Sequence, residues 1–269
     1  LTQETGTTLC KSLSYRLTLR EFSLTVTARL FDGNPTLELT AQADRFPVGD
    51  ETGVPQLVFS APMAYQAQAL RCDMQVGVQD RQIQGTHDDF TRNFLFGVPE
   101  EGDRGLALVS DCKYGCRCQE NALTLTLLRA SDGPDRYPEI GQRFCRIGLT
   151  PAQVSALKEL GERFAHWSFP YTTNTAHAGT LPLSAQLISV RGDVTVSGVK
   201  MAEEGSGLVL RLANLYNDRP ADAEVSFGFP AERAVETDLA EQEKRELALE
   251  NGKLSLTLEP GQIVTVMVL

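Results

Sequence analysis

Short runs in which apolar and polar residues alternate recur along the whole chain, and they constrain its fold most strongly. The clearest run is Ala122 to Leu128, where leucine alternates with threonine; it follows the apolar run Gly105 to Val109 and a polar break from Asp111 to Arg117. Alternation with a period of two is typical of a half-buried strand. The segment 105–129 therefore predicts two strands around a polar turn, and the recurrence of such runs predicts an all-β chain.

Arg129 follows the second of these runs directly, so a cation stands at the end of an apolar strand. Two interpretations are open. If that end of the strand faces a cleft, Arg129 is placed to reach a polar ligand. If it does not, Arg129 is a solvated strand end, which is the commoner situation for a charged side chain.

The same pattern predicts further strands at 15–20, 23–30, 36–43, 57–61 and 74–78, and another after the central segment at 142–149. From residue 183 the chain reads as a compact all-β unit, with runs at 187–190, 194–200, 208–214, 223–227, 234–237, 253–258 and 263–269. Short strands separated by closely spaced turns such as Asn251-Gly252 and Pro260-Gly261 are typical of a sandwich. We predict two domains, 1–180 and 181–269, the second a β-sandwich.

One helix is predicted, over Thr150 to His166. Thr150 has the character of an N-cap, Pro151 would occupy the first helical position, and Gln153 would complete a capping box. Val154, Leu157, Leu160 and Phe164 form an apolar stripe at helical spacing. The pattern indicates a helix packed on a sheet.

Charge and hydropathy narrow the classes of partner. The formal net charge is −10 and the isoelectric point is about 4.9. Nucleic acids and anionic membranes bind basic surfaces, so this acidic balance argues against both as partners. No apolar run is long enough for a membrane-spanning helix. Leu1 to Thr8 is polar, so no signal peptide is expected, and the missing initial methionine favours a piece of a longer protein.

Cysteine and histidine spacing does not predict a metal site. Cys112, Cys116 and Cys118 are clustered, but no second cysteine pair or nearby histidine pair completes four ligands. We expect the six cysteines to be free thiols of a reducing compartment, which favours the cytoplasm. His87-Asp88-Asp89 also lacks a histidine partner at ligand spacing, and the same holds for the pair His166 and His177.

The central segment resembles a stretch in the C-terminal half of family 38 glycoside hydrolases, the retaining α-mannosidases. Five consecutive residues match the family motif: Asp111, Cys112, Lys113, Tyr114 and Gly115. Further matches at the spacing of the family motif are Asn121, Leu128, Arg129, Pro134 and Asp135. The C-terminal segments VTVSGVKMAEEGSGLVLRLANLYND and LENGKLSLTLEPGQIVTVMVL also follow the family pattern. The chain departs from the pattern at Arg143, which stands where the family usually has a histidine.

The resemblance implies a galactose-mutarotase-like supersandwich, truncated at its N-terminus, followed by a smaller C-terminal β-sandwich. It also implies that the aspartate nucleophile and the zinc ion of the retaining reaction belong to a separate catalytic domain of the same polypeptide. This chain is then the non-catalytic part of an α-mannosidase, inactive alone, that supports the catalytic domain and lines one side of the sugar site. No cofactor, nucleic acid or membrane partner is expected for this chain, and the question whether it forms a homo-oligomer is left open.

By match to the family motif, Arg129 is the residue expected to bind substrate, through hydrogen bonds from its guanidinium to sugar hydroxyls. Tyr114 either stacks or hydrogen-bonds nearby or only shapes its turn, and Asp111 is expected to cap that turn through its own carboxylate. Three alternatives to the mannosidase role stay open: a stand-alone carbohydrate-binding module, a mutarotase-type enzyme with His87 as its only candidate base, and a purely structural domain.

Overall fold

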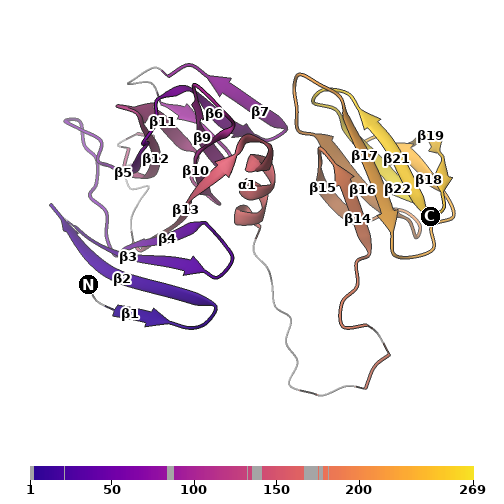
Figure 1. Ribbon diagram of the computed structural model, residues 1–269, viewed down its shortest axis with the longest axis horizontal. Coiled ribbons are helices and arrows are strands. Elements are labelled where there is room, and N and C mark those ends of the chain that lie inside the picture. The colour runs from indigo at the N-terminus through magenta and orange to yellow at the C-terminus, as the bar shows by residue number, and fades with distance from the viewer. Residues whose placement is uncertain are drawn as a thin grey trace. The chain divides into compact units, whose positions relative to one another are not determined.

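The computed structural model describes residues 3–20, 22–83, 88–131, 133–134, 141–166, 175, 178–180 and 182–269. The chain divides into two compact units, Leu1–Gln75 with Gln79–Ser168, and Val76–Val78 with Phe169–Leu269 (Figure 1). Nearly all regular structure is β-strand, which confirms the predicted all-β class. The domain boundary placed at residue 180 stays a prediction.

A nine-stranded sheet forms the larger layer of the first unit, and we call it the large sheet. Its order is β1-β2-β3-β4-β13-β10-β9-β6-β7. The strands are β1 (Gln3–Gly6), β2 (Cys10–Leu19), β3 (Phe22–Phe31), β4 (Leu37–Ala43), β6 (Ala67–Met74), β7 (Gly77–Arg81), β9 (Phe94–Pro99), β10 (Arg104–Ser110) and β13 (Arg143–Gln153). The strands predicted at 15–20, 23–30, 36–43, 105–109 and 142–149 are present, with shifted ends.

A four-stranded sheet, the small sheet, packs on one face of the large sheet. Its order is β5 (Gln56–Pro62), β12 (Ala122–Arg129), β11 (Gly115–Gln119) and β8 (Asp89–Phe90). The Sγ of Cys145 on β13 lies 3.8 Å from the carbonyl oxygen of Leu127 on β12. The Sγ atoms of Cys72 on β6 and Cys116 on β11 lie 4.0 Å apart. These contacts put β12 over β13 and β11 over β6, so β5 is the edge strand on the side of β4.

The prediction that the runs at 105–109 and 122–128 flank a single polar turn was wrong. The first run is β10 of the large sheet, whereas the second is β12 of the small sheet, and β11 lies between them in the chain. The inward side chains of β11 are Cys116 and Cys118, which are 1% and 4% exposed. Cysteine behaves here as a small apolar residue, so a strand is present where the sequence looks like a turn.

The predicted strand at 74–78 was also wrong, because Gln75 and Val76 form the turn between β6 and β7. Gly77, at the start of β7, has a φ of +115°, a conformation that L side chains rarely adopt. The backbone therefore reverses direction inside the apolar run, and the periodicity of the side chains does not reveal it.

The helix is present but starts later than predicted. Thr150 to Gln153 continue β13 and pair with β10, from Thr150 opposite Ala107 to Gln153 opposite Arg104. A 3-10 turn (Val154–Ala156) and α1 (Leu157–Ala165) follow, with Ala156 as the N-cap. The proposed cap at Thr150 is therefore wrong, because strand pairing overrides the local capping signal. Leu157 and Phe164 of the predicted stripe are buried against the sheet.

The second unit is a β-sandwich (Figure 1). One sheet has the order β14 (Ile188–Gly192), β17 (Ala221–Phe227), β21 (Lys253–Leu258) and β20 (Leu249–Glu250); the other has β15 (Val194–Met201), β16 (Leu208–Asn214), β22 (Ile263–Val268), β18 (Ala234–Thr237) and β19 (Glu243–Leu247). All seven predicted strands are present. Strands β19 and β20 were not predicted, since the segment from Glu243 to Glu250 is mostly polar.

Candidate functional site

Arg129 is the last residue of β12 and is exposed. The register between β5 and β12 shifts between Thr126 and Leu128, so Leu127 is an extra residue in a β-bulge. Leu125 faces the core, and strict alternation would turn Arg129 to the core as well. Because of the bulge, Arg129 instead lies opposite Gln56, on the outer face of the small sheet.

The outer face of the small sheet carries hydroxyl and amide groups near Arg129. The Nε2 atom of Gln56 donates a hydrogen bond to Oγ1 of Thr126 at 3.0 Å. In the next row, the hydroxyl oxygens of Ser60 and Thr124 lie 3.3 Å apart. Gln56 and Ser60 are exposed, whereas Thr126 is half-buried and Thr124 is buried. The exposed amide and hydroxyl groups can both donate and accept hydrogen bonds.

Tyr114 precedes β11 and is 57% exposed, and its carbonyl oxygen accepts a hydrogen bond from the Thr91 amide at 2.8 Å. Since β11 and β12 are antiparallel, the start of β11 and the end of β12 lie at the same end of the small sheet. The structure therefore brings the two predicted site residues, Tyr114 and Arg129, to one end of this sheet.

The turn between β10 and β11 is capped by a different residue from the one predicted. The hydroxyl of Ser110 accepts the backbone N–H groups of Lys113, at 3.0 Å, and of Cys112, at 3.4 Å. The carboxylate of Asp111 instead approaches the guanidinium of Arg146 at 3.5 Å. The expected Asx-type role of Asp111 is thus filled by Ser110.

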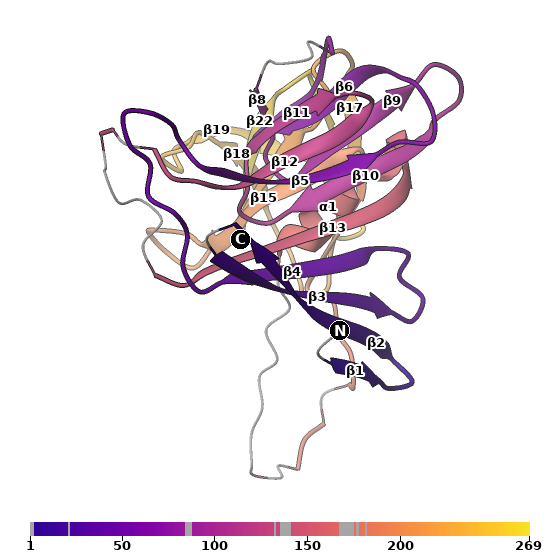
Figure 2. The same ribbon diagram turned by 90° about the vertical axis from the view of Figure 1, so that its left-hand side faces the viewer.

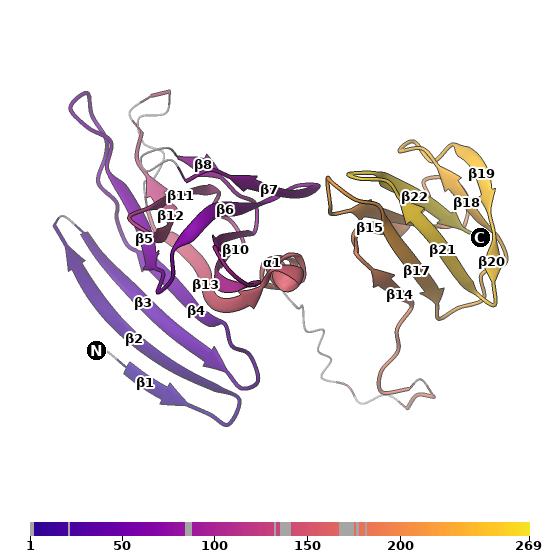
Figure 3. The ribbon, with the colours of Figure 1, turned by 45° about the horizontal axis from the view of Figure 1, so that its top comes forward.

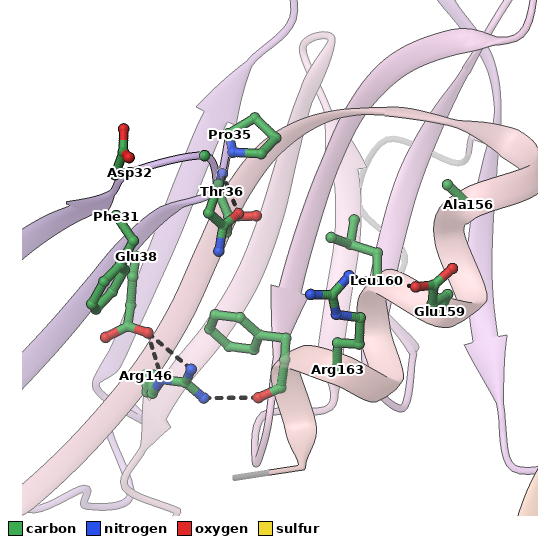
Figure 4. A pocket seen from close by; sticks show the side chains of 13 residues that line it. Phe31, Asp32, Pro35, Thr36, Glu38, Arg146, Ala156, Glu159, Leu160 and Arg163 are labelled. Atoms are coloured by element: carbon green, nitrogen blue, oxygen red, sulfur yellow. Dashed lines mark hydrogen bonds and ion pairs between the residues drawn. The ribbon is translucent and has the colours of Figure 1, made fainter. Parts of the chain in front are cut away.

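Arg146 lies at a hollow of about 650 Å³ between the turn that follows β3 and helix α1 (Figure 4). Its guanidinium is 2.9 Å from the Glu38 carboxylate, donates to the Phe164 carbonyl at 2.8 Å, and lies 3.9 Å from the Phe164 ring centroid. This cluster was not predicted from the sequence, since Glu38 and Arg146 are 108 positions apart. These contacts engage the cation within the protein, so the hollow does not present it to a ligand.

The described residues contain no group of three histidine, cysteine or acidic side chains that could hold a metal ion. His87 and His177 lie outside the described residues. Asp88 forms an ion pair with Arg117 at 3.4 Å, and Asp89 forms one with Arg81. Their carboxylates therefore have cationic partners within the chain.

All six cysteines are free thiols. Burial raises the pKa of Cys112 to about 11. The contact with Cys72, followed by burial, raises the pKa of Cys116. Thiols with raised pKa values are poor nucleophiles and poor metal ligands near neutral pH. In the part of the chain that the structure describes, no helix has the length and apolar character needed to cross a lipid bilayer.

Two models of one protein family match the chain. The model described as "Glycosyl hydrolases family 38 C-terminal domain" matches residues 4–137, and the model described as "Glycosyl hydrolases family 38 C-terminal beta sandwich domain" matches residues 193–266. The first match contains the small sheet and most of the large sheet, and the second contains most of the sandwich.

Several curated relatives of this chain are α-mannosidases by name. The chain is 32% identical over 171 residues to "Alpha-mannosidase 2C1" of Mus musculus, a match that covers 61% of this chain and 16% of the mouse protein. It is 28% identical over 116 residues to "Alpha-mannosidase" of Saccharomyces cerevisiae, covering 42% of this chain and 10% of the yeast protein. The chain thus matches a small part of the length of these relatives.

Solved structures share the fold. A family 38 glycosyl hydrolase from Enterococcus faecalis superposes with a TM-score of 0.72 at 15% identity, covering 98% of this chain and 36% of that one. An α-mannosidase from Enterococcus faecalis V583 gives the same TM-score at 16% identity, with 34% of its chain covered. These structures share the fold, and the two family models establish that the chain belongs to glycosyl hydrolase family 38, as its C-terminal β-domains.

Proposed function

We propose that this chain is the non-catalytic C-terminal part of an α-mannosidase that hydrolyses α-linked mannosides with retention. In this proposal it supports the catalytic domain of the same polypeptide and lines one side of the sugar site. The observation that carries the proposal is the position of Arg129, the arginine of the family-like motif. A β-bulge turns it to an exposed, hydroxyl-bearing face.

The role of Arg129 follows from the geometry of its side chain. A guanidinium holds its N–H donors in a rigid planar fork, which suits two adjacent sugar hydroxyls. Gln56 and Thr126 lie beside it on the same face, and Tyr114 lies at the same end of the sheet. We assign to these residues the orientation of the sugar, and Tyr114 can stack on it or bond to it.

Retaining glycosidases need a carboxylate nucleophile and a second carboxyl group on either side of the scissile bond. The zinc ion that the resemblance implies would bind sugar hydroxyls. The described residues offer no fitting metal site, so we place the zinc and both carboxyl groups in the catalytic domain. This chain alone is then expected to leave an α-mannoside intact.

Replacing Arg129 by alanine in the complete mannosidase polypeptide should lower kcat/KM for an aryl α-mannoside by about 10–100-fold. The estimate follows because a hydrogen bond to a charged group contributes about 1.5–3 kcal/mol, and each 1.4 kcal/mol changes the rate about tenfold. The kcat/KM of Arg129→Lys should lie between those of the wild type and of Arg129→Ala, because lysine keeps the positive charge but lacks the planar fork of N–H donors. Initial rates over a range of substrate concentrations measure the effect.

The control is Arg104→Ala, which removes an exposed arginine at the first position of β10. It should leave kcat/KM close to the wild-type value. Wild-type kinetics in Arg129→Ala would remove the substrate role from Arg129. Circular dichroism of each variant shows whether folding is intact.

The alternative, a stand-alone carbohydrate-binding module, draws on the exposed aromatic residues Tyr114 and Phe90, which are 57% and 56% exposed. Isothermal titration of the chain with mannose-containing oligosaccharides distinguishes the two proposals. Binding that Tyr114→Ala abolishes, in a chain that no catalytic domain accompanies, would favour the module. A cytoplasmic location is part of our main proposal, on the basis of the six free thiols.

A further inference from the structure

Two buried thiols face each other between the two sheets of the first unit. The Sγ atoms of Cys72, on β6 of the large sheet, and Cys116, on β11 of the small sheet, lie 4.0 Å apart, and the two residues are 0% and 1% exposed. Figures 2 and 3 show β6 and β11 side by side, with β8 next to β11. A bond between these two sulfur atoms would therefore join one sheet to the other.

The two sulfur atoms are close enough for such a bond to form within the folded chain. A disulfide has an S–S length of about 2.05 Å, so the atoms must approach each other by about 2 Å. Rotation about the Cα–Cβ bonds of the two cysteines moves the sulfur atoms over distances of this order. Sandwich domains of the immunoglobulin type carry a disulfide between two packed sheets, so this kind of packing accommodates the bond.

The edge of the small sheet gives an oxidant a route to Cys116. β8 is a two-residue strand at this edge, and its Asp89 lies opposite Cys116. Segments with few contacts open locally at a lower cost in free energy than global unfolding. Opening of β8 would uncover Cys116 while Cys72 stays beside it.

We propose that Cys72 and Cys116 are a redox pair that a peroxide converts to a disulfide, which ties the small sheet to the large sheet. In the first step, the thiolate of Cys116 attacks one oxygen of hydrogen peroxide. The O–O bond breaks, Cys116 becomes a sulfenic acid, and the departing hydroxide takes up the proton that the thiol lost and leaves as water.

In the second step, the Cys72 thiol gives up its proton and its sulfur attacks the sulfenic sulfur of Cys116. The S–S bond forms, the S–O bond breaks, and the oxygen leaves with that proton as water. The two thiols together lose two electrons, and one peroxide is reduced to two waters.

The first step should be slow and the product reversible. The contact with Cys72, followed by burial, raises the pKa of Cys116, which keeps its thiolate scarce near neutral pH. Once the sulfenic acid forms, the neighbouring Cys72 should react with it before it is oxidised further to the irreversible sulfinic acid. Oxidation of a core cysteine would thus end in a cross-link that a dithiol reductant removes.

Tryptic peptide mapping tests the proposal, because cleavage after lysine and arginine places each of the six cysteines in a separate peptide. The folded protein is treated with hydrogen peroxide, quenched with catalase, alkylated in denaturant and digested. The expected product links peptide 72–81 to peptide 114–117, and a dithiol reductant added before alkylation should remove the link. Absence of the link, or a link between peptides 105–113 and 144–146 in its place, would overturn the proposal.

Two alanine variants separate the pair from buried thiols in general. In Cys72→Ala the sulfenic acid of Cys116 has no neighbouring thiol, so Cys116 should accumulate as the sulfinic acid, which the reductant does not restore. The matched control is Cys118→Ala, which removes a thiol on the same strand that is 4% exposed and should leave the link unchanged. Equal amounts of sulfinic acid at Cys116 in the wild type and in Cys72→Ala would contradict the role of Cys72.

Hydrogen–deuterium exchange measures the connection between the sheets. Cys72 and Cys116 are 44 positions apart, and a link across a loop of this length restricts local opening of β11. The amides of β11 should therefore exchange about tenfold more slowly, or slower still, after oxidation. The amides of β18 in the second unit provide an internal control and should not change. Unchanged exchange of β11 in a sample that carries the link would overturn the proposed tie between the sheets.

Discussion

Replacing Lys158 by methionine should lower the free energy of unfolding of the first unit by about 3–5 kcal/mol, as expected when a buried charge loses its partner. The Nζ of Lys158, on α1, lies 2.6 Å from Oδ1 of Asp73, on β6, and donates to the Met74 carbonyl at 3.3 Å. The Asp73 side chain is fully buried, and its Oδ2 accepts the Asn93 N–H at 3.1 Å. The variant leaves this carboxylate buried without its cation.

Hydrogen–deuterium exchange of β9 and β10 peptides in increasing urea measures this loss within the first unit. Arg163→Met is the matched control, because Arg163 lies on the same helix in an exposed ion pair with Glu159 and should contribute at most about 1 kcal/mol. The double variant Asp73→Leu/Lys158→Met should recover part of the stability, since replacing both partners leaves no uncompensated charge. A Lys158→Met variant as stable as the control would show that the ion pair does not hold α1 on the sheet.

The stability deficit of Lys158→Met should shrink as the pH falls. Burial raises the pKa of Asp73 above its ordinary value of 3.8, and Lys158 opposes that rise. Without Lys158 the folded-state pKa rises further. Between that raised pKa and 3.8 the folded chain binds more protons than the unfolded chain, so the free energy of unfolding increases as the pH falls through this window. Unfolding at neutral and at mildly acidic pH measures the effect, which should be absent in Asp73→Asn/Lys158→Met.

Local patterns predicted the strands of this protein better than their connections. In the second unit the predicted strands agree closely with the observed ones, because turn dipeptides such as Asn251-Gly252 strongly favour a hairpin. In the first unit, the position of Arg129 depends on the bulge at Leu127, which is defined by pairing with β5. A bulge changes the face of the sheet from which the following side chains project, and no local sequence pattern predicted this one.

Long-range contacts explain the remaining differences. Thr150 to Gln153 carry helix-capping residues, yet they pair with β10 because that strand offers backbone partners. Lys158 and Asp73 are 85 positions apart, so their ion pair could not be inferred from either segment alone. The family resemblance correctly placed the chain in family 38. It indicated Arg129 as the motif residue that binds substrate, but it gave no role to Asn121, for which the structure suggests one.

Replacing Asn121 by alanine should lower the free energy of unfolding of the first unit by about 3 kcal/mol. Asn121 has a φ of 57° in the two-residue turn between β11 and β12. Its Oδ1 accepts the Ala67 N–H at 3.1 Å, and its Nδ2 donates to the carbonyl oxygens of Met63 and Tyr65 at 3.2 and 2.6 Å. Alanine cannot form these three hydrogen bonds, and the loss of each should cost about 1 kcal/mol, or more where a buried backbone group is left unsatisfied. Alanine also tolerates the left-handed backbone conformation less well than asparagine.

Two further variants separate the backbone contribution from the side-chain contribution. Asn121→Gly restores the conformational freedom and still lacks the three bonds, so it should be about 1 kcal/mol more stable than Asn121→Ala. Asn251 has a φ of 53° in an exposed hairpin turn of the second unit, so Asn251→Ala should cost the second unit only the backbone contribution of about 1 kcal/mol. Equal losses in Asn121→Ala and Asn251→Ala would mean that the bonds to the β5–β6 connection contribute nothing. The expected difference would show that Asn121 joins the small sheet to that connection, so that its match to the family motif reflects the fold, whereas we propose a substrate role for the match at Arg129.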